Sequence, residues 1–204
     1  MLDATLRPLI GPPLDAAGRW LAARGMTASA VTLVGLIASV AAAAAISAGR
    51  FGPGLALIGL SRFLDGLDGA VARATAPTDA GGYLDSVCDY VFYAGVPLGF
   101  ALADPEQNAL PAAVLLASFL LTCSSFLAFA ALAAKRGLGT TAPGRKAFFY
   151  SGGLIEGTET ILFFTLMVSW PARFPELSWI CATLCVITAV MRTINALRGL
   201  GARH

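Results

Sequence analysis

Long uncharged stretches alternate with short charged ones along this chain of 204 residues. Residues 25–49 and 107–134 contain no Asp, Glu, Lys or Arg. Each stretch exceeds the roughly 20 residues that a helix needs to cross the hydrocarbon of a bilayer. Together with less uniform apolar segments, they predict six spans, at 27–48, 52–74, 82–103, 110–134, 146–169 and 177–198. The predicted fold class is an all-α integral membrane protein with six transmembrane helices.

The first 24 residues mix apolar and charged positions and form no uncharged span. Leucines recur between charged side chains such as Arg19, a pattern typical of amphipathic helices that lie in the membrane interface. Pro12 and Pro13 interrupt backbone hydrogen bonding, so the pattern predicts two short interfacial helices. We expect an amphipathic juxtamembrane segment over 1–24 and one six-helix domain over 25–204.

The distribution of Lys and Arg predicts the orientation of the spans. With six spans, both termini lie on one side of the membrane. That side collects eleven basic residues: Arg7, Arg19, Arg24, Arg73, Lys135, Arg136, Arg145, Lys146, Arg192, Arg198 and Arg203. The opposite side has Arg50 and Arg173. Because basic residues favour cytoplasmic loops, we expect both termini in the cytoplasm, in a bacterial inner membrane.

Composition agrees with a membrane protein. The chain is 57% hydrophobic and 13% charged, against about 25% charged residues in soluble domains. Its formal net charge is only +2, and no basic patch is interleaved with aromatic residues. A nucleic-acid partner is therefore not expected.

Four aspartates interrupt the second and third spans near their cytoplasmic ends. Asp65 and Asp68 are three residues apart, and Asp85 and Asp89 are four apart. These spacings place each pair on one helix face. Because the connection between the two spans is short, the helices should be antiparallel neighbours. We expect the four carboxylates to converge.

Converging carboxylates at the edge of the hydrocarbon need compensating charge. A charge at the centre of a membrane helix costs about 2.5–3.5 kcal/mol on insertion scales, and neighbouring carboxylates repel one another. Divalent cations resolve both problems, and an oxygen-only donor set suits Mg²⁺, Mn²⁺ or Ca²⁺. Gly66, Gly69, Gly81 and Gly82 leave room beside the acids for a bulky ligand or for another helix, and Arg73 can pair with a phosphate. The pattern predicts a site for a metal-bound pyrophosphate at the cytoplasmic interface.

Two interpretations without catalysis remain open. In the first, the aspartates form structural ion pairs with Arg62 and Arg73, although the segment has more acids than arginines. In the second, the protein is a membrane cation-binding or transport protein. The gathering of the acids at one interface, rather than across the bilayer, argues against a transport pathway.

The same segment resembles the signature of the CDP-alcohol phosphotransferase (CDP-alcohol phosphatidyltransferase) family, Asp-x2-Asp-Gly-x2-Ala-Arg-x(7–8)-Gly-x3-Asp-x3-Asp. The matching residues are Asp65, Asp68, Gly69, Ala72, Arg73, Gly81, Asp85 and Asp89. The resemblance implies a membrane enzyme, usually a homodimer, in which an alcohol attacks the phosphorus of a CDP-linked donor. Such a reaction releases CMP and leaves a phosphodiester.

The resemblance also implies residue roles. The four aspartates would hold two divalent metal ions, Mg²⁺ or Mn²⁺, and Asp89 would be the general base for the acceptor hydroxyl. Asp68, Gly69, Ala72, Arg73 and Gly81 would form the CDP-binding site. At the start of the first span, a Pro-Asn pair frequent in the family is replaced by Ala28 and Ser29. Thr27 or Ser29 is therefore a candidate helix N-cap.

The acceptor alcohol is predicted from the second half of the chain. Four basic residues, Lys135, Arg136, Arg145 and Lys146, lie in the second cytoplasmic loop, where they bind anionic groups or only satisfy the positive-inside rule. Glu156 and Glu159 are three residues apart in the predicted 146–169 helix, where they contact the acceptor or pair with Arg192.

Family members that accept inositol phosphate tend to carry arginines near the two glutamate positions. Carboxylates would repel a phosphate, so we expect CDP-diacylglycerol as donor and a non-phosphorylated polyol or amino-alcohol as acceptor. Glycerol 3-phosphate or inositol phosphate as acceptor remains an alternative. So does a CDP-choline or CDP-ethanolamine donor with diacylglycerol as acceptor.

Overall fold

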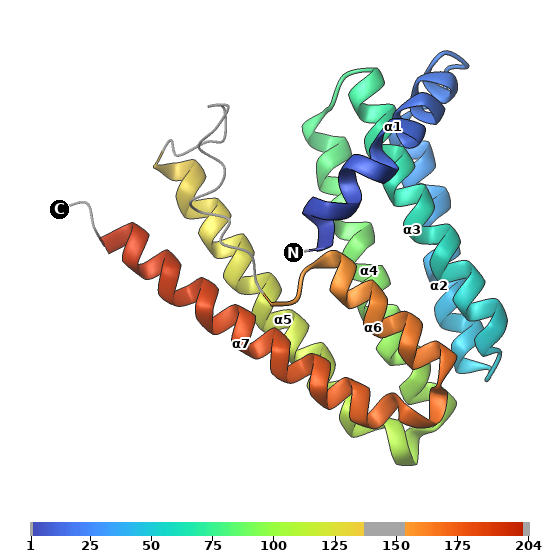
Figure 1. The fold of residues 1–204 in the computed structure, drawn as a ribbon, viewed down its shortest axis with the longest axis vertical. Coiled ribbons are helices and arrows are strands. Elements are labelled where there is room, and N and C mark those ends of the chain that lie inside the picture. The colour runs from blue at the N-terminus through green and yellow to red at the C-terminus, as the bar shows by residue number, and fades with distance from the viewer. Residues whose placement is uncertain (1, 137–153, 202–204) are drawn as a thin grey trace.

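The computed structural model describes residues 2–136 and 154–201. Within those ranges the chain is helical and contains no strand (Figure 1). The elements are α1 (Leu2–Ala22), α2 (Ala28–Ser47), α3 (Phe51–Ala74), α4 (Asp79–Ala103), α5 (Pro105–Lys135), α6 (Gly157–Ser169), the short 3-10 helix η1 (Pro171–Arg173) and α7 (Phe174–Gly201). The all-α prediction is confirmed.

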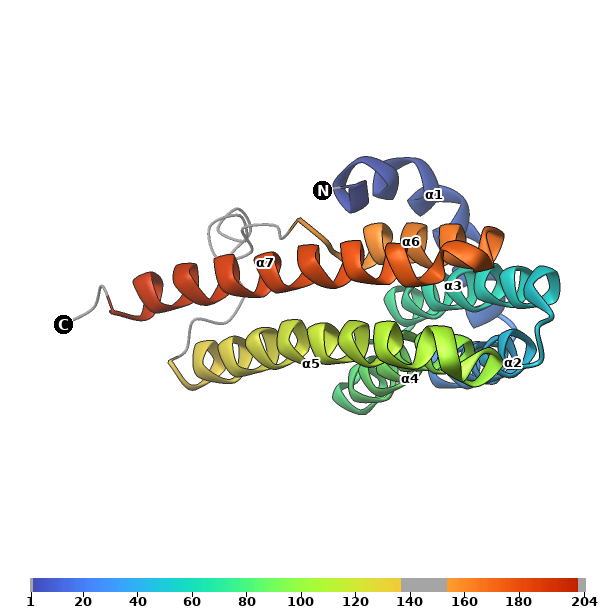
Figure 2. The ribbon, with the colours of Figure 1, turned by 90° about the horizontal axis from the view of Figure 1, so that it is seen from below.

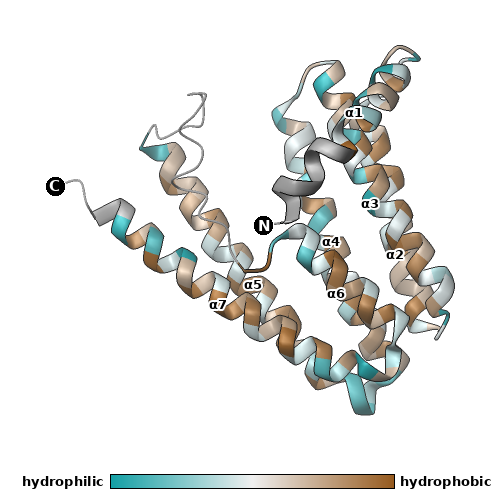
Figure 3. Ribbon diagram, in the orientation of Figure 1, coloured by the Kyte–Doolittle hydropathy of each residue, from teal (hydrophilic) through white to brown (hydrophobic). Residues whose placement is uncertain are grey.

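Among the described residues, four segments are long and apolar enough to cross a membrane: α2, α4, α5 and the segment Pro171–Arg198, which is η1 with most of α7. Hydrophobic residues dominate the middles of these helices, and hydrophilic ones gather toward helix ends (Figure 3). Helix α3 has 24 residues but contains the charged part of the signature, and α6 has only 13 residues. The structure therefore supports four spans directly.

Two of the predicted helix boundaries are wrong. The first 22 residues do not form two helices, because α1 continues through Pro12 and Pro13. Packing of α1 against α3 compensates for the roughly 3 kcal/mol that an internal proline costs.

The predicted 146–169 helix is the second error. Its first eight positions lie outside the described residues, and Leu154–Glu156 are not helical. The helix begins only at Gly157, because a local capping arrangement at Glu156 and Glu159 starts it there.

Helices α2, α3 and α4 form one closely packed group. Helix α2 contacts both α3 and α4. A Cβ added at Gly99 of α4 would lie 2.8 Å from the backbone oxygen of Ala43 in α2, so the two helices approach as closely as small residues allow. This group contains all of the signature residues.

Helices α5, α6 and α7 form a second group against the first. Helix α5 packs along α7, and α6 contacts both α3 and α7. The Phe100 and Phe174 rings stack with centroids 4.1 Å apart, and the Phe92 and Phe164 rings meet edge to face at 5.6 Å. The C-terminal ends of α5 and α7 project beyond the other helices (Figures 1 and 2).

Candidate functional site

Helix α1 lies against the part of α3 that carries the signature. A Cβ added at Gly18 would lie 2.6 Å from the backbone carbon of Ala70, which is closer than real Cβ contacts. Leu14 packs beside Gly66, where an added Cβ would lie 3.1 Å from its Cδ1. The space beside Gly66 is therefore occupied by α1, which is the second of the two occupants, ligand or helix, that the sequence left open.

The turn between α3 and α4 is short and ends in a helix cap. The Thr78 hydroxyl accepts a hydrogen bond from the backbone N–H of Gly81 at 3.1 Å, and α4 begins at Asp79. The cap fixes where α4 starts and so places Asp85 and Asp89 beside α3. At Gly82, an added Cβ would meet no atom within 4 Å.

Three of the four signature carboxylates converge as predicted. One oxygen each from Asp65, Asp85 and Asp89 lies within 4.8 Å of the others. The carboxylates come from two helices and are partly exposed. A hard divalent cation prefers this type of oxygen donor, so the three residues fit a Mg²⁺ or Mn²⁺ site.

The fourth carboxylate is turned toward α2. Asp68 is 5% exposed and accepts a hydrogen bond from the Thr32 hydroxyl at 2.7 Å. The Thr32 residue is also buried, so this bond ties α2 to the signature away from bulk water. The role of Thr32 was not predicted, because the family resemblance at the start of this helix is incomplete.

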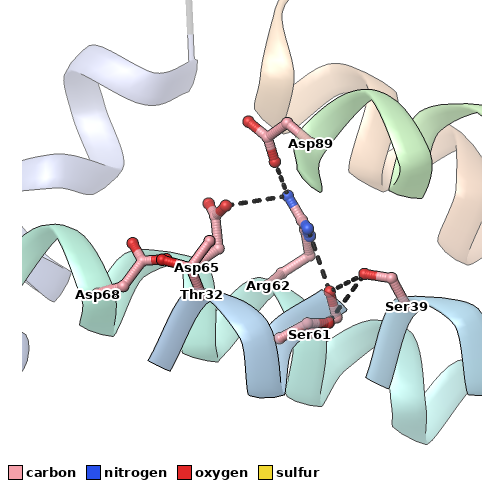
Figure 4. A network of polar contacts seen from close by, with 8 residues as sticks. Thr32, Ser39, Ser61, Arg62, Asp65, Asp68 and Asp89 are labelled. Carbon is pink, nitrogen blue, oxygen red and sulfur yellow. Dashed lines mark hydrogen bonds and ion pairs between the residues drawn. The ribbon is translucent and has the colours of Figure 1, made fainter. Parts of the chain in front are cut away.

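Arg62 is the cation that the structure places among the carboxylates (Figure 4). Its Nη1 donates to Asp89 Oδ1 at 2.7 Å and lies 3.4 Å from Asp65 Oδ1. Of the structural ion pairs considered from the sequence, those of Arg62 are therefore formed. The Ser61 hydroxyl accepts from Nη2 at 3.1 Å and lies 2.6 Å from the Ser39 hydroxyl.

Arg73, the other arginine of that interpretation, pairs elsewhere. Its Nε and Nη2 lie 3.2 and 2.8 Å from Asp15 Oδ1 of α1. Both side chains are about half exposed, so Arg73 remains open to a ligand. Gly69 lies one turn earlier, and an added Cβ there would lie 3.3 Å from Arg73 Nη1. Gly69 therefore leaves room for this guanidinium.

The residues predicted for the acceptor are spread over several elements. Lys135 is the last residue of α5 and Arg136 is its C-cap, whereas Arg145 and Lys146 lie outside the described residues. Two residues predicted for the CDP-binding site lie on the signature helices. Ala72 is on α3, one residue before Arg73, and Gly81 is in the first turn of α4.

The two glutamates do not lie on one face inside a helix. Glu156 is the N-cap of α6, and the Glu159 carboxylate accepts from the Glu156 backbone N–H at 3.1 Å. An ion pair with Arg192 is not formed in the described part of the chain. Arg192 instead donates to the backbone oxygen of Thr122 at 3.1 Å.

A family model for CDP-alcohol phosphatidyltransferases matches residues 25–194. This chain belongs to the CDP-alcohol phosphatidyltransferase family. It is therefore a phosphotransferase of phospholipid synthesis. The matched range includes the carboxylate cluster and five of the six predicted spans in full.

Known proteins resemble this transferase over most of its length. The inner membrane protein YnjF of Escherichia coli is 50% identical, and the aligned region covers 94% of this chain and 93% of YnjF. The archaetidylinositol phosphate synthase of Pyrococcus horikoshii is 27% identical, covering 81% of this chain and 89% of its own.

Solved structures show the same fold. The phosphatidylinositol phosphate synthase of Mycobacterium tuberculosis in complex with manganese and citrate superposes with a TM-score of 0.71 at 25% identity, covering 90% of this chain and 88% of that one. The same protein with CDP-DAG bound gives a TM-score of 0.70 at 24% identity, and the superposition covers 90% of this chain and 93% of that one.

Proposed function

We propose that the transferase moves a phosphatidyl group from CDP-diacylglycerol to a small polar alcohol and releases CMP. The observation that carries this proposal is the convergence of Asp65, Asp85 and Asp89 within 4.8 Å of one another. The exposed Arg73 lies about two turns beyond Asp65 on the same helix, α3. The structure of the M. tuberculosis relative with CDP-DAG bound supports this choice of donor.

The four signature aspartates are proposed to hold two divalent ions, Mg²⁺ or Mn²⁺. The oxygen donors of Asp65, Asp85 and Asp89 fit such ions, and Asp68 lies one turn from Asp65 on α3. The manganese in the M. tuberculosis structure supports the choice of metal. When bound, the ions neutralise the charge of the pyrophosphate and of the leaving CMP.

The remaining chemistry belongs to residues of the chain. Asp89 accepts the proton of the acceptor hydroxyl, and the hydroxyl oxygen forms a bond to the phosphorus that carries diacylglycerol. The bond from that phosphorus to the bridging oxygen breaks, and CMP leaves with that oxygen. Arg73 contacts a phosphate of the donor, and Gly69, Ala72 and Gly81 leave space for the nucleotide.

The membrane arrangement is part of the proposal. We infer that α3 and α6 complete six spans, that both termini are cytoplasmic, and that the site lies at the cytoplasmic interface. The charge distribution and the inner membrane assignment of YnjF support this topology. We further propose a homodimer, with an interfacial segment over 1–24 and the six-helix domain over 25–204.

The start of α6 is proposed to contact the acceptor. An added Cβ at Gly157 would lie 3.5 Å from the hydroxyl of Tyr93, which is one turn beyond Asp89 on α4. Gly157, the residue that follows Glu156, therefore lies beside Tyr93, and Tyr93 shares a helix face with the proposed base. Its carboxylate favours a neutral polyol or amino-alcohol over a phosphorylated acceptor.

A phosphorylated acceptor is the second candidate, because the P. horikoshii and M. tuberculosis relatives are inositol phosphate-type synthases by name. Lys135 and Arg136 at the end of α5, with Arg145 and Lys146, would then contact the acceptor phosphate.

Headgroup analysis tests both candidates. Purified protein in detergent with Mn²⁺ and CDP-diacylglycerol is offered glycerol, inositol, serine, choline, glycerol 3-phosphate and inositol phosphate. We expect product with a non-phosphorylated alcohol and none after chelation. Product only with phosphorylated acceptors would replace the first candidate by the second. No product from any alcohol, with Mn²⁺ bound, would favour a cation-binding protein.

A further inference from the structure

Arg62 lies outside the family signature, which begins at Asp65, yet its guanidinium contacts carboxylates of both signature helices. It sits one turn before Asp65 on α3, with a side chain that is 13% exposed. A charged group this far from water requires compensating partners.

Three kinds of contact hold the guanidinium of Arg62. Nη1 reaches Asp89 at 2.7 Å and Asp65 at 3.4 Å, so it links carboxylates of two helices. The guanidinium carbon stands 3.8 Å from the ring centroid of Phe92, and the Ser61 hydroxyl accepts from Nη2. Within the described part of the chain, the buried Nε donates no hydrogen bond.

Nη1 contacts the same carboxylates that a bound metal ion would need as ligands. The Asp65 and Asp89 carboxylates that Nη1 contacts belong to the cluster suited to a divalent cation. An ion and a guanidinium compete for the same oxygens, and two positive charges at this distance also repel each other.

We propose that Arg62 is the resident counter-cation of the site. It holds the Asp65 and Asp89 carboxylates together before metal binds, and it yields these oxygens when a divalent ion enters. Arg62 is thus a positioning residue, with Phe92 and Ser61 keeping the guanidinium beside the site. The inference rests on the metal site of the proposed function.

This role predicts opposite effects on the two states of the protein. Removing the charge of Arg62 leaves the carboxylates uncompensated, so the metal-free protein loses stability. The same change removes a competing cation, so divalent metal binds more tightly. A purely structural role would lower the melting temperature equally with and without metal and leave the metal affinity unchanged.

Mn²⁺ titration of the full-length protein in detergent tests the proposal, with melting temperatures measured with and without Mn²⁺. For Arg62→Gln we expect on the order of tenfold tighter Mn²⁺ binding. The metal-free melting temperature should fall by about 5 °C or more, and Mn²⁺ should restore most of that loss. Arg62→Lys keeps the charge and is expected to bind Mn²⁺ like the wild type.

Ser61→Ala provides an independent variant if Arg62→Gln does not fold. It removes the acceptor of Nη2 while Ser39 keeps its bond to the Gly35 oxygen at 3.0 Å. It should tighten Mn²⁺ binding by roughly two- to threefold, since it only loosens the guanidinium.

The outcomes separate the two proposals. Equal or weaker Mn²⁺ binding by Arg62→Gln, or by Ser61→Ala where it is the variant that folds, overturns the role of Arg62 and leaves the transferase mechanism intact. A wild-type protein that binds no Mn²⁺ overturns the metal site and the role of Arg62 together.

Discussion

Gly18→Ala tests whether the N-terminal helix is part of the site. Gly18 is a point of close approach between α1 and α3. The added Cβ would lie 2.6 Å from the Ala70 carbon, 2.7 Å from its Cβ and 2.9 Å from its oxygen. Two of these atoms belong to the backbone, so no side chain can turn away to make room. Either α1 or the signature part of α3 must move.

The size of the effect follows from these distances. Ordinary contacts begin at 3.4 Å, so the helices must separate by roughly 0.8 Å at this point. Overpacking of this kind costs about 1–3 kcal/mol, whereas replacing glycine by alanine in a helix gains about 1 kcal/mol. The difference is a net loss of about 0–2 kcal/mol. Because two of the three contacted atoms are backbone, we expect the upper half of this range, about 1–2 kcal/mol, which corresponds to a fall in melting temperature of roughly 2–8 °C.

Gly59→Ala is the matched control. Gly59 lies within α3, and an added Cβ there would meet no atom within 4 Å. This variant should be neutral or slightly more stable, because only the helix propensity changes. Thermal unfolding and CMP release of both variants in detergent provide the comparison. A Gly18→Ala protein as stable and active as Gly59→Ala would refute the close docking of α1 on the signature.

Two further predictions concern contacts made by signature residues. Asp15→Asn removes the partner of Arg73. Because an exposed ion pair contributes only about 0–1 kcal/mol, we expect an unchanged melting temperature. The KM for CDP-diacylglycerol should rise severalfold, and Asp15→Glu should be closer to wild type. Thr32→Val removes the hydroxyl that donates to buried Asp68, so the free energy of unfolding should fall by about 1–3 kcal/mol. Thr32→Ser keeps a hydroxyl and should keep the wild-type stability. Equal melting temperatures for the two variants would contradict the importance of this bond.

The convergence of the carboxylates was predictable because it depends on local geometry. Helical periodicity places Asp65 on the face of Asp68, and Asp85 on the face of Asp89, and a short turn brings the two helices together. The same reasoning identified Thr27 as a candidate N-cap, and its hydroxyl accepts from the Ala30 backbone N–H at 3.3 Å.

Contacts between distant segments were not predictable in the same way. Thr32 and Asp68 are 36 positions apart, and Asp15 and Arg73 are 58 apart. No periodicity links such pairs, because their meeting depends on how whole helices pack. The same limit explains Gly66, whose missing side chain makes room for Leu14 of α1.

The errors at helix ends have a related cause. Spacing alone made Glu156 and Glu159 a pair on one helix face, but the same spacing also satisfies a capping box. The sequence contains both possibilities, and the local fold selects the cap. Pro12 and Pro13 indicated a break that the docking of α1 overrides.

CMP release by Asp89→Asn is the most direct test of the proposed reaction. Turnover is measured with CDP-diacylglycerol, Mn²⁺ and the preferred alcohol, alongside equilibrium binding of CDP-diacylglycerol. Asp79→Asn, at the first residue of α4 and outside the carboxylate cluster, is the control and should keep wild-type turnover. We expect a loss of about 100-fold or more in CMP release by Asp89→Asn, with donor binding retained. Undiminished CMP release by Asp89→Asn would contradict the proposed reaction.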